Sequence, residues 1–258
     1  MGNSHKSKGI CPSNRNFSQI GVVPQTRTTM EKKMTARPTF RHLDIPFNEK
    51  QTSIIPFEMQ PIVQIADGSV KAWELLYRGA RPVDWSAVDA AVINYLSTPR
   101  PDLPPLYVNL SNEVLMSESG PDLAQVVSAN DVTFELSEAV SGHSDRAAIA
   151  DKVNQLIDVG ARVALDDFGA GRDGFERLYA IRNVAAVKID REFLLTCMRR
   201  TDACRMLSML VAQWRREGIK SIAEGVETAK MLMFAQSVNV DLAQGWYLDA
   251  AVGMSQAR

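Results

Sequence analysis

The sequence predicts an α/β protein that folds as a modified TIM-type (β/α)8 barrel with one antiparallel strand. Three observations predict this fold. Strand-like and helix-like segments alternate from about residue 57 onward, and the strand-like segments are short. The sequence also lacks the GxGxxG loop that usually follows the first strand of a doubly wound sheet, which favours a closed barrel over an open sheet.

The length and the composition fit one folded domain with a sizeable core. The chain has 258 residues, of which 45% are hydrophobic and 23% are charged. Because no apolar run approaches the ~18 residues that span a bilayer, we expect no contact with a membrane. The three cysteines, Cys11, Cys197 and Cys204, form no CxxC pair and cannot build a disulfide framework. We therefore expect a cytoplasmic protein.

We divide the chain into a disordered basic N-terminal tail, residues 1–50, and a barrel domain, residues 51–258. The first 41 residues carry eight Lys and Arg residues and one Glu, whereas the net charge of the whole chain is −1, so the barrel domain is acidic. The tail is rich in polar residues and shows no sustained periodicity. This composition favours a solvated extension over a segment that binds nucleic acid.

The predicted strands are apolar or alternating runs. They cover residues 57–65, 70–77, 106–110, 132–136, 162–165, 185–189, 220–223 and 241–243. The first two flank Asp67-Gly68, a dipeptide typical of tight hairpin turns. We therefore expect the first barrel strand to run antiparallel to the second.

The predicted helices lie between the later strands, at residues 86–96, 145–159, 202–217 and 228–237. Ser144 and Thr228 are predicted N-caps, because their hydroxyl groups can accept from the first free backbone N–H groups of a helix. Gly160 and Gly218 follow two of the helices, as expected where the chain leaves a helix in a left-handed conformation.

Polar side chains that can bind a metal ion lie at or just after the ends of five predicted strands. They are Glu74, Asn109, Glu135, Asp166 with Asp167, and Glu224. The carboxyl ends of barrel strands converge on one rim, so these side chains should lie close together. Neighbouring carboxylates repel one another, and a divalent cation relieves that repulsion. All-oxygen ligands favour Mg²⁺ or Mn²⁺, with Ca²⁺ as a competitor, and the scattered histidines disfavour zinc.

Two basic residues accompany these acids. Lys188 lies near the end of the strand predicted at 185–189, where it either neutralises the neighbouring acids or positions or deprotonates an attacking water. Arg78 follows Glu74 by four residues, and its forked donors suit a phosphate group. The residues alone leave both roles of Lys188 open, and a surface role for Arg78 as well.

A series of short motifs resembles the EAL family in kind and in order, over about residues 56–250. The motifs are Phe57-Glu58-Met59-Gln60-Pro61-Ile62-Val63, Trp73-Glu74-Leu75-Leu76-Tyr77-Arg78, Val108-Asn109-Leu110-Ser111, Phe134-Glu135-Leu136-Ser137-Glu138, Asp166-Asp167-Phe168-Gly169-Ala170-Gly171, Val187-Lys188-Ile189-Asp190, Ala223-Glu224-Gly225-Val226-Glu227-Thr228 and Gln244-Gly245-Trp246. Any one of them is a weak signal, but their shared order is specific.

The resemblance implies a metal-dependent phosphodiesterase that hydrolyses cyclic di-GMP to linear pGpG. It implies metal ligands at Glu74, Asn109, Glu135 and Asp166, with Asp167 serving a second metal ion. The catalytic residues would be Lys188, which holds the attacking water, together with Glu224 and Glu74. Substrate would contact Arg78, Gln60 and Gln244, whereas Glu138 and Glu227 would support loops. One or two Mg²⁺ or Mn²⁺ ions are expected, and Ca²⁺ should inhibit.

Departures from the family pattern support a second hypothesis, a non-catalytic module of the same fold that binds cyclic di-GMP or a protein partner such as a transcription regulator. The segment between Glu74 and Asn109 spans only 35 positions, fewer than is usual in the family. The loop after Asp167 is also altered, in a region associated with homodimer formation. Because every expected metal ligand is retained, the sequence favours the active enzyme.

Overall fold

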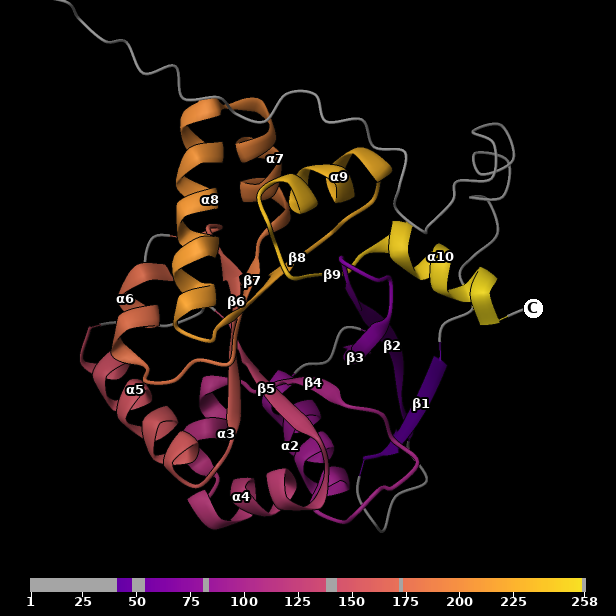
Figure 1. The fold of residues 1–258 in the computed structure, drawn as a ribbon. Coiled ribbons are helices and arrows are strands. Elements are labelled where there is room, and N and C mark those ends of the chain that lie inside the picture. The colour runs from indigo at the N-terminus through magenta and orange to yellow at the C-terminus, as the bar shows by residue number, and fades with distance from the viewer. Residues whose placement is uncertain (1–40, 48–53, 81–83, 138–142, 172–173, 257–258) are drawn as a thin grey trace, which may run out of the picture.

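A closed barrel of eight strands forms the centre of the molecule (Figure 1). The computed structural model describes residues 41–47, 54–80, 84–137, 143–171 and 174–256. Their strands form one sheet in chain order from β1 to β9, and pairing between β2 and β9 closes it. Strand β2 runs antiparallel to both β3 and β9, whereas the later neighbours are parallel. The predicted barrel with one antiparallel strand is therefore confirmed.

The strands agree closely with those predicted from apolar runs. Their bounds are β1 Arg41–Pro46, β2 Ile54–Gln64, β3 Val70–Tyr77, β4 Leu106–Asn109, β5 Val132–Leu136, β6 Arg162–Phe168, β7 Ala186–Ile189, β8 Lys220–Ala223 and β9 Leu242–Ala243. The expected hairpin at Asp67-Gly68 joins β2 to β3, and Gly68 has a positive φ of 72°.

Strand β1 was not predicted, and it lies in the segment that we expected to be coil. It pairs antiparallel with residues 54–59 of β2. Ile45 is fully buried there, whereas its neighbours Asp44 and Pro46 are exposed. Such a short alternation is hard to recognise beside polar residues. The expectation of coil is therefore wrong for residues 41–46, and residues 1–40 and 48–50 of the predicted tail lie outside the described residues.

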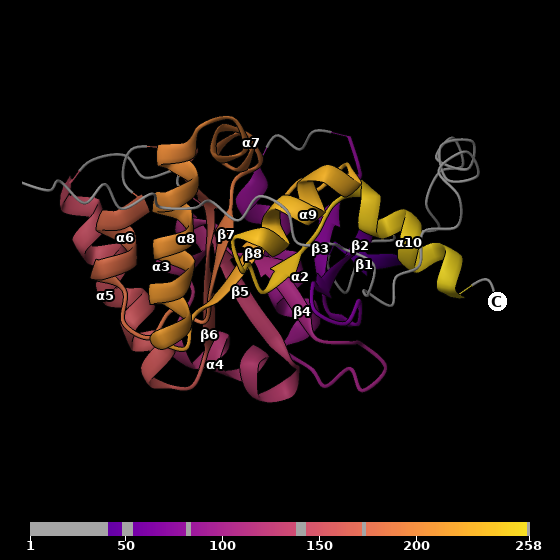
Figure 2. The same ribbon diagram turned by 45° about the horizontal axis from the view of Figure 1, so that its top comes forward.

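The helices pack around the barrel, and Figure 2 shows α10 beside β2, away from α5, α6 and α8. Their bounds are α2 Trp85–Leu96, α3 Asn112–Ser117, α4 Gly120–Ala129, α5 His143–Asp158, α6 Gly174–Ala180, α7 Arg191–Arg199, α8 Thr201–Arg216, α9 Ala229–Ser237 and α10 Trp246–Gln256. Helices α2, α5, α8 and α9 were predicted.

Most of the predicted helix ends agree with the structure. The hydroxyl of Thr228 accepts a hydrogen bond from the backbone N–H of Met231, as an N-cap should. Gly160 and Gly218 have positive φ angles of 99° and 80° after α5 and α8. The prediction for Ser144 is wrong, because α5 begins at His143 and therefore includes Ser144.

The apolar core has two parts. The larger part fills the space between the barrel and its helices, and it includes the buried rings of Phe134 and Trp214. The smaller part lies inside the barrel. It consists of Ile62, Ala72, Ala164, Ala186, Ile222 and Leu242, with Tyr107 packed against them. This inner layer closes the barrel and supports the polar residues above it.

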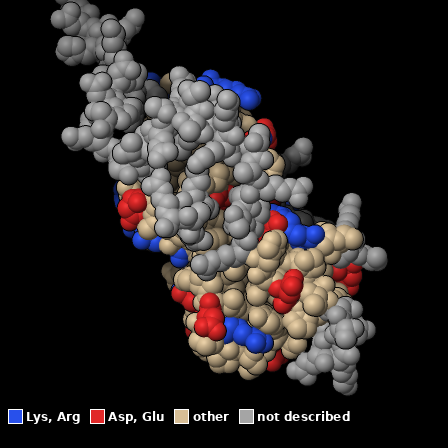
Figure 3. All heavy atoms as spheres, turned by 90° about the vertical axis from the view of Figure 1, so that its right-hand side faces the viewer, with Lys and Arg blue, Asp and Glu red and all other residues tan. Residues whose placement is uncertain are grey.

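None of the helices in the described ranges combines the length and the apolar character that a transmembrane helix requires. On the face of the molecule at the right of Figure 1, the visible acidic and basic side chains are interspersed and do not form a patch of one sign (Figure 3).

Candidate active site

A layer of polar side chains lies inside the barrel, one step above the apolar layer. In β3, β6, β7, β8 and β9 the polar residue follows the inward apolar residue by two positions, because alternate residues of a strand face the same side. In β2 it precedes Ile62 by two positions, since this strand runs the other way. The layer comprises Gln60, Glu74, Asp166, Lys188, Glu224 and Gln244, joined by Asn109 and Glu135 from β4 and β5.

Lys188 lies at the centre of this polar layer and contacts four carboxylates. Its Nζ atom is 2.7 Å from Glu135 Oε1 and 2.8 Å from Glu224 Oε1. It is also 3.2 Å from Asp166 Oδ1 and 3.3 Å from Glu74 Oε2. The ammonium group is completely buried. One cation therefore balances only part of the negative charge that surrounds it.

The electrostatics of the polar layer follow from burial and from this excess of acids. Burial raises the pKa of Glu135 well above its usual range, and the nearby Glu74 carboxylate adds to the shift while Lys188 opposes it. Burial also raises the pKa of Glu224, to about 8. Burial acts to lower the pKa of Lys188, but the surrounding carboxylates outweigh it and raise this pKa well above its usual value. The surrounding carboxylates therefore favour the charged ammonium form of Lys188.

Asp166 and Asp167 both face the site although they are consecutive. The register between β6 and β7 shifts between Leu165 and Phe168, and Asp167 adopts a left-handed conformation with φ of 55°. This irregularity replaces the normal alternation of strand side chains. Oxygen atoms of Asp166, Asp167 and Glu224 lie within 4.8 Å of one another. Burial and the Asp166 charge raise the pKa of Asp167.

The donor set fits a hard divalent cation. Gln244 donates through Nε2 to Glu74, and more weakly to Glu224 at 3.4 Å. The buried atoms Glu135 Oε2 and Gln244 Oε1 have no hydrogen-bond partner within the described part of the chain. These free oxygens and the cluster at Asp166 supply the acceptors that Mg²⁺ or Mn²⁺ uses.

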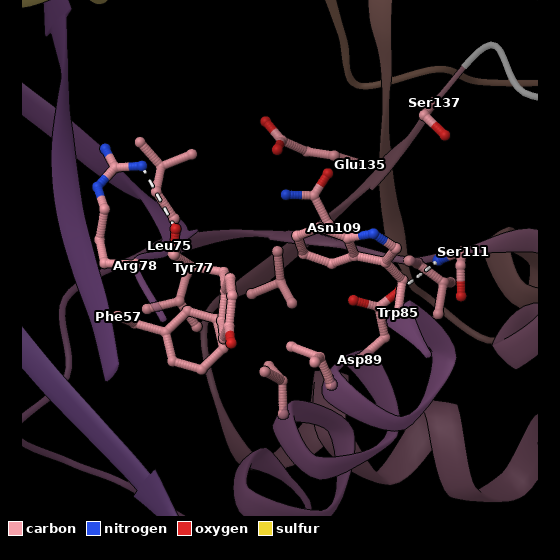
Figure 4. A pocket seen from close by; sticks show the side chains of 15 residues that line it. Phe57, Leu75, Tyr77, Arg78, Trp85, Asp89, Asn109, Ser111, Glu135 and Ser137 are labelled. Atoms are coloured by element: carbon pink, nitrogen blue, oxygen red, sulfur yellow. Dashed lines mark hydrogen bonds between the residues drawn. The ribbon is translucent and has the colours of Figure 1, made fainter. Parts of the chain in front are cut away.

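A cavity of about 380 Å³ opens beside this layer, between β3, α2 and β4 (Figure 4). The Asn109 amide and the Glu135 carboxylate lie next to each other at one side of it, as their register on β4 and β5 requires. Arg78 lies across the cavity, where its Nε donates to Glu58 at 2.7 Å. The ring of Trp85 from α2 lines the same space. Among its described residues, the shortened segment between Glu74 and Asn109 forms one helix, α2. This helix lines one side of the open cavity.

Two further predicted site residues, Gln60 and Glu227, have hydrogen-bond partners of their own. Gln60 is buried and donates through Nε2 to Asp249 Oδ2 at 2.8 Å. Glu227 accepts from Arg191 at 2.9 Å, in the loop after β8. Glu138 lies outside the described residues.

Two residues that position the site were not found from the sequence. Arg177 of α6 is buried and donates to the carbonyl of Leu136 and, at 3.5 Å, to that of Asp166, so it holds the ends of β5 and β6. Asp249 of α10 contacts Gln60 across most of the chain. No local pattern signals either contact, because each depends on how a helix packs over the strand ends.

Comparison with known proteins gives one family. The family model described as EAL domain matches residues 86–251. The oxygen sensor protein DosP of Escherichia coli is 26% identical over 56% of this chain and 19% of its own length. The cyclic di-GMP phosphodiesterase RocR of Pseudomonas aeruginosa is 28% identical over 54% of this chain and 38% of its own. This chain therefore spans less than half of either relative.

The fold is also found among solved structures. The manganese and cyclic di-GMP complex of Klebsiella pneumoniae BlrP1 superposes with a TM-score of 0.62 at 22% identity, over 81% of this chain and 59% of that one. The strands β2 and β3, which carry Gln60 and Glu74, precede the residues matched by the family model. The polar layer nevertheless includes them.

Proposed function

Because this chain belongs to the EAL domain family, we propose that it hydrolyses cyclic di-GMP to linear pGpG with the help of Mg²⁺ or Mn²⁺. The observation that carries the proposal is the convergence of four carboxylates on the buried Nζ of Lys188. Such a group of acids is costly to keep buried for stability alone, and it suits a site that gathers cations around a phosphodiester.

We assign the metal ligands to the oxygen donors of the polar layer. Glu74, Asn109, Glu135 and Asp166 would hold one ion, and Asp167 would serve a second. The buried Oε2 atom of Glu135, which has no hydrogen-bond partner among the described residues, supports this assignment. A divalent ion bound there would polarise the phosphate and lower the pKa of water.

The residues of the chain then have separate roles in the reaction. The Lys188 ammonium, which lies among the carboxylates of the polar layer, donates to the attacking water and holds it. The Glu224 carboxylate accepts a hydrogen bond from the same water and orients it. As the water oxygen bonds to phosphorus, the bond from phosphorus to the ribose 3′ oxygen breaks, and the proton that the water loses ends on that oxygen, which leaves as a hydroxyl group. Arg78, at the edge of the cavity, would hold a phosphate of the substrate.

The test is turnover of cyclic di-GMP by purified protein, with the products separated by chromatography. Linear pGpG should form with Mg²⁺ or Mn²⁺, and added Ca²⁺ should inhibit because its larger coordination sphere places the water poorly. Glu74→Ala and Lys188→Ala should abolish turnover, whereas Lys220→Ala, at an exposed lysine on β8, should not.

The alternative outcomes have clear meanings. Binding of the dinucleotide without turnover in either metal would favour the non-catalytic receptor. Neither binding nor cleavage would leave a protein-interaction role as the leading idea, and stimulation by Ca²⁺ would contradict the assigned mechanism.

A further inference from the structure

We infer that Asp249 is a positioning residue, which fixes the side-chain amide of Gln60 so that its oxygen faces a hydrogen-bond donor of the bound ligand. The inference rests on the proposed function, because it deepens the description of that same site. The observation that carries it is the buried hydrogen bond from Gln60 Nε2 to Asp249 Oδ2, 2.8 Å long, between residues that are 189 positions apart.

The location of Gln60 makes its orientation matter. It occupies the polar layer on β2 and pairs in register with Glu74 on β3. It is 8% exposed. Its amide has one donor end and one acceptor end, which a ligand would distinguish. Whichever end is turned toward the barrel mouth decides what Gln60 can recognise.

The chemistry of Asp249 determines that orientation. An ionised carboxylate only accepts hydrogen bonds, so it must meet the NH₂ end of the amide. The bond to Asp249 is the one hydrogen bond of the Gln60 side chain in the described part of the structure. The amide oxygen of Gln60 therefore remains available as an acceptor. An asparagine in place of Asp249 could accept from the NH₂ group of the Gln60 amide or donate to its oxygen. The orientation of Gln60 would then no longer be fixed.

A purely structural role explains Asp249 poorly. Its side chain is 4% exposed, and its Oδ1 atom has no hydrogen-bond partner among the residues described. A buried carboxylate with a single amide partner costs stability. Burial raises its pKa to about 6, the bond from Gln60 and the charge of Arg78 act in the opposite direction, and Glu58 adds to the rise. The buried carboxylate of Asp249 lowers the stability of the fold, which indicates a role in the site.

The backbone before Asp249 fixes its position over Gln60. Gly245 has φ of 142°, and a Cβ atom there would lie 2.3 Å from the backbone nitrogen of Val226. The backbone N–H of Tyr247 donates to the carbonyl of Val226 at 3.1 Å. These contacts tie the start of α10 to the loop after β8, and Asp249 lies within the first turn of that helix.

The experiment is a double-mutant cycle with Asp249→Asn, Gln60→Ala and the double variant, in full-length protein with Mg²⁺. We expect each single variant to raise the KM for cyclic di-GMP about tenfold with kcat changed less than about twofold, the size expected for one hydrogen bond. Adding Asp249→Asn to Gln60→Ala should change KM by less than about twofold, because Asp249 acts through Gln60. If the protein binds without turnover, the same cycle is measured on the Kd.

Two controls separate this role from a general effect on folding. Asp241→Asn is the matched control. Asp241 accepts from the N–H and the hydroxyl of Ser221 at the opposite end of the barrel, so this variant should lose stability and keep KM. Asp249→Asn should keep or raise its melting temperature at pH 7.5, because this substitution removes a buried charge that lowers stability.

The outcomes distinguish the two proposals. Effects of Asp249→Asn and Gln60→Ala that multiply in the double variant, or an unchanged KM in Asp249→Asn, would overturn the positioning role while the proposed function stands. A wild-type protein that neither binds nor cleaves cyclic di-GMP would overturn the proposed function, and the positioning role with it.

Discussion

Lys188 Nζ lies 2.7 Å from Glu135 Oε1, and both side chains are completely buried. Neither charge can be screened by water, so each depends on the other and on the groups beside them. Glu74, Asp166 and Glu224 share the same ammonium. Under the proposed function, the balance of charge at this one point should affect stability, metal affinity and catalysis together, and the predictions below separate these effects.

Lys188→Met, whose side chain is unbranched, one atom shorter and uncharged, should leave the carboxylates without a counter-ion. We expect the free energy of unfolding in EDTA to fall by about 3–5 kcal/mol, as for other broken buried ion pairs. Urea titration would measure this loss, and turnover should fall at least about 100-fold. Lys220→Met, at an exposed position, serves as the control. Equal stability of Lys188→Met and wild type in EDTA would contradict this account.

The stability of the EDTA-treated protein should decrease as the pH rises through about 8. Burial raises the pKa of Glu224 to about 8, above its value in the unfolded chain, so the folded state holds its proton more tightly. The stability that protonated Glu224 contributes is fully present below about pH 4.5, and it is lost as the pH rises to the pKa of Glu224 in the folded state. Melting temperatures from pH 6 to 9 would measure it. Glu224→Gln should flatten the curve, and an unchanged slope in this variant would exclude Glu224 as the cause.

The two substitutions Asp167→Asn and Asp167→Ala should differ in stability and agree in metal binding. Both remove a carboxylate from the group that includes Asp166 and Glu224, so both should weaken the binding of Mn²⁺. Asparagine tolerates the left-handed backbone at φ 55°, whereas alanine costs roughly 1 kcal/mol there. Calorimetric titration with Mn²⁺ and chemical denaturation would separate the two effects. Wild-type affinity in both variants would remove Asp167 from the metal site.

The sequence was sufficient to predict the barrel and the group around Lys188, because both depend on strand periodicity. Alternation places each polar residue two positions from an apolar one, as in Ala186 and Lys188, and barrel closure then brings these residues together. The pair Asp166 and Asp167 was placed at the right strand end. The bulge that turns both inward depends on the register with β7, which no local pattern encodes.

The strand β1 and the contact between Gln60 and Asp249 could not be predicted from the sequence, because both depend on distant parts of the chain. The strand β1 is short and depends on the long β2 for its pairing, so its own residues carry little signal. The contact between Gln60 and Asp249 joins the two ends of the domain, and it exists because α10 packs against β2.

Gly245→Ala should damage both stability and activity, and Gly218→Ala provides a matched comparison. Both glycines have positive φ angles, 142° and 80°. A Cβ at position 245 would lie 2.3 Å from the nitrogen of Val226, whereas a Cβ at position 218 would meet nothing within 4 Å. Gly218→Ala should therefore cost only about 1 kcal/mol of backbone strain, and turnover should be unchanged.

Gly245→Ala adds a steric clash with fixed backbone to that strain. We expect it to lower the free energy of unfolding by more than about 3 kcal/mol, which denaturant titration would measure. Because Gly245 lies between Gln244 of the polar layer and Asp249 of α10, the forced movement should also raise the KM for cyclic di-GMP. Equal losses of stability in the two glycine variants would show that the loop after β8 moves enough to accommodate the Cβ atom at position 245. The close packing that holds α10 in place would then not be needed for the site.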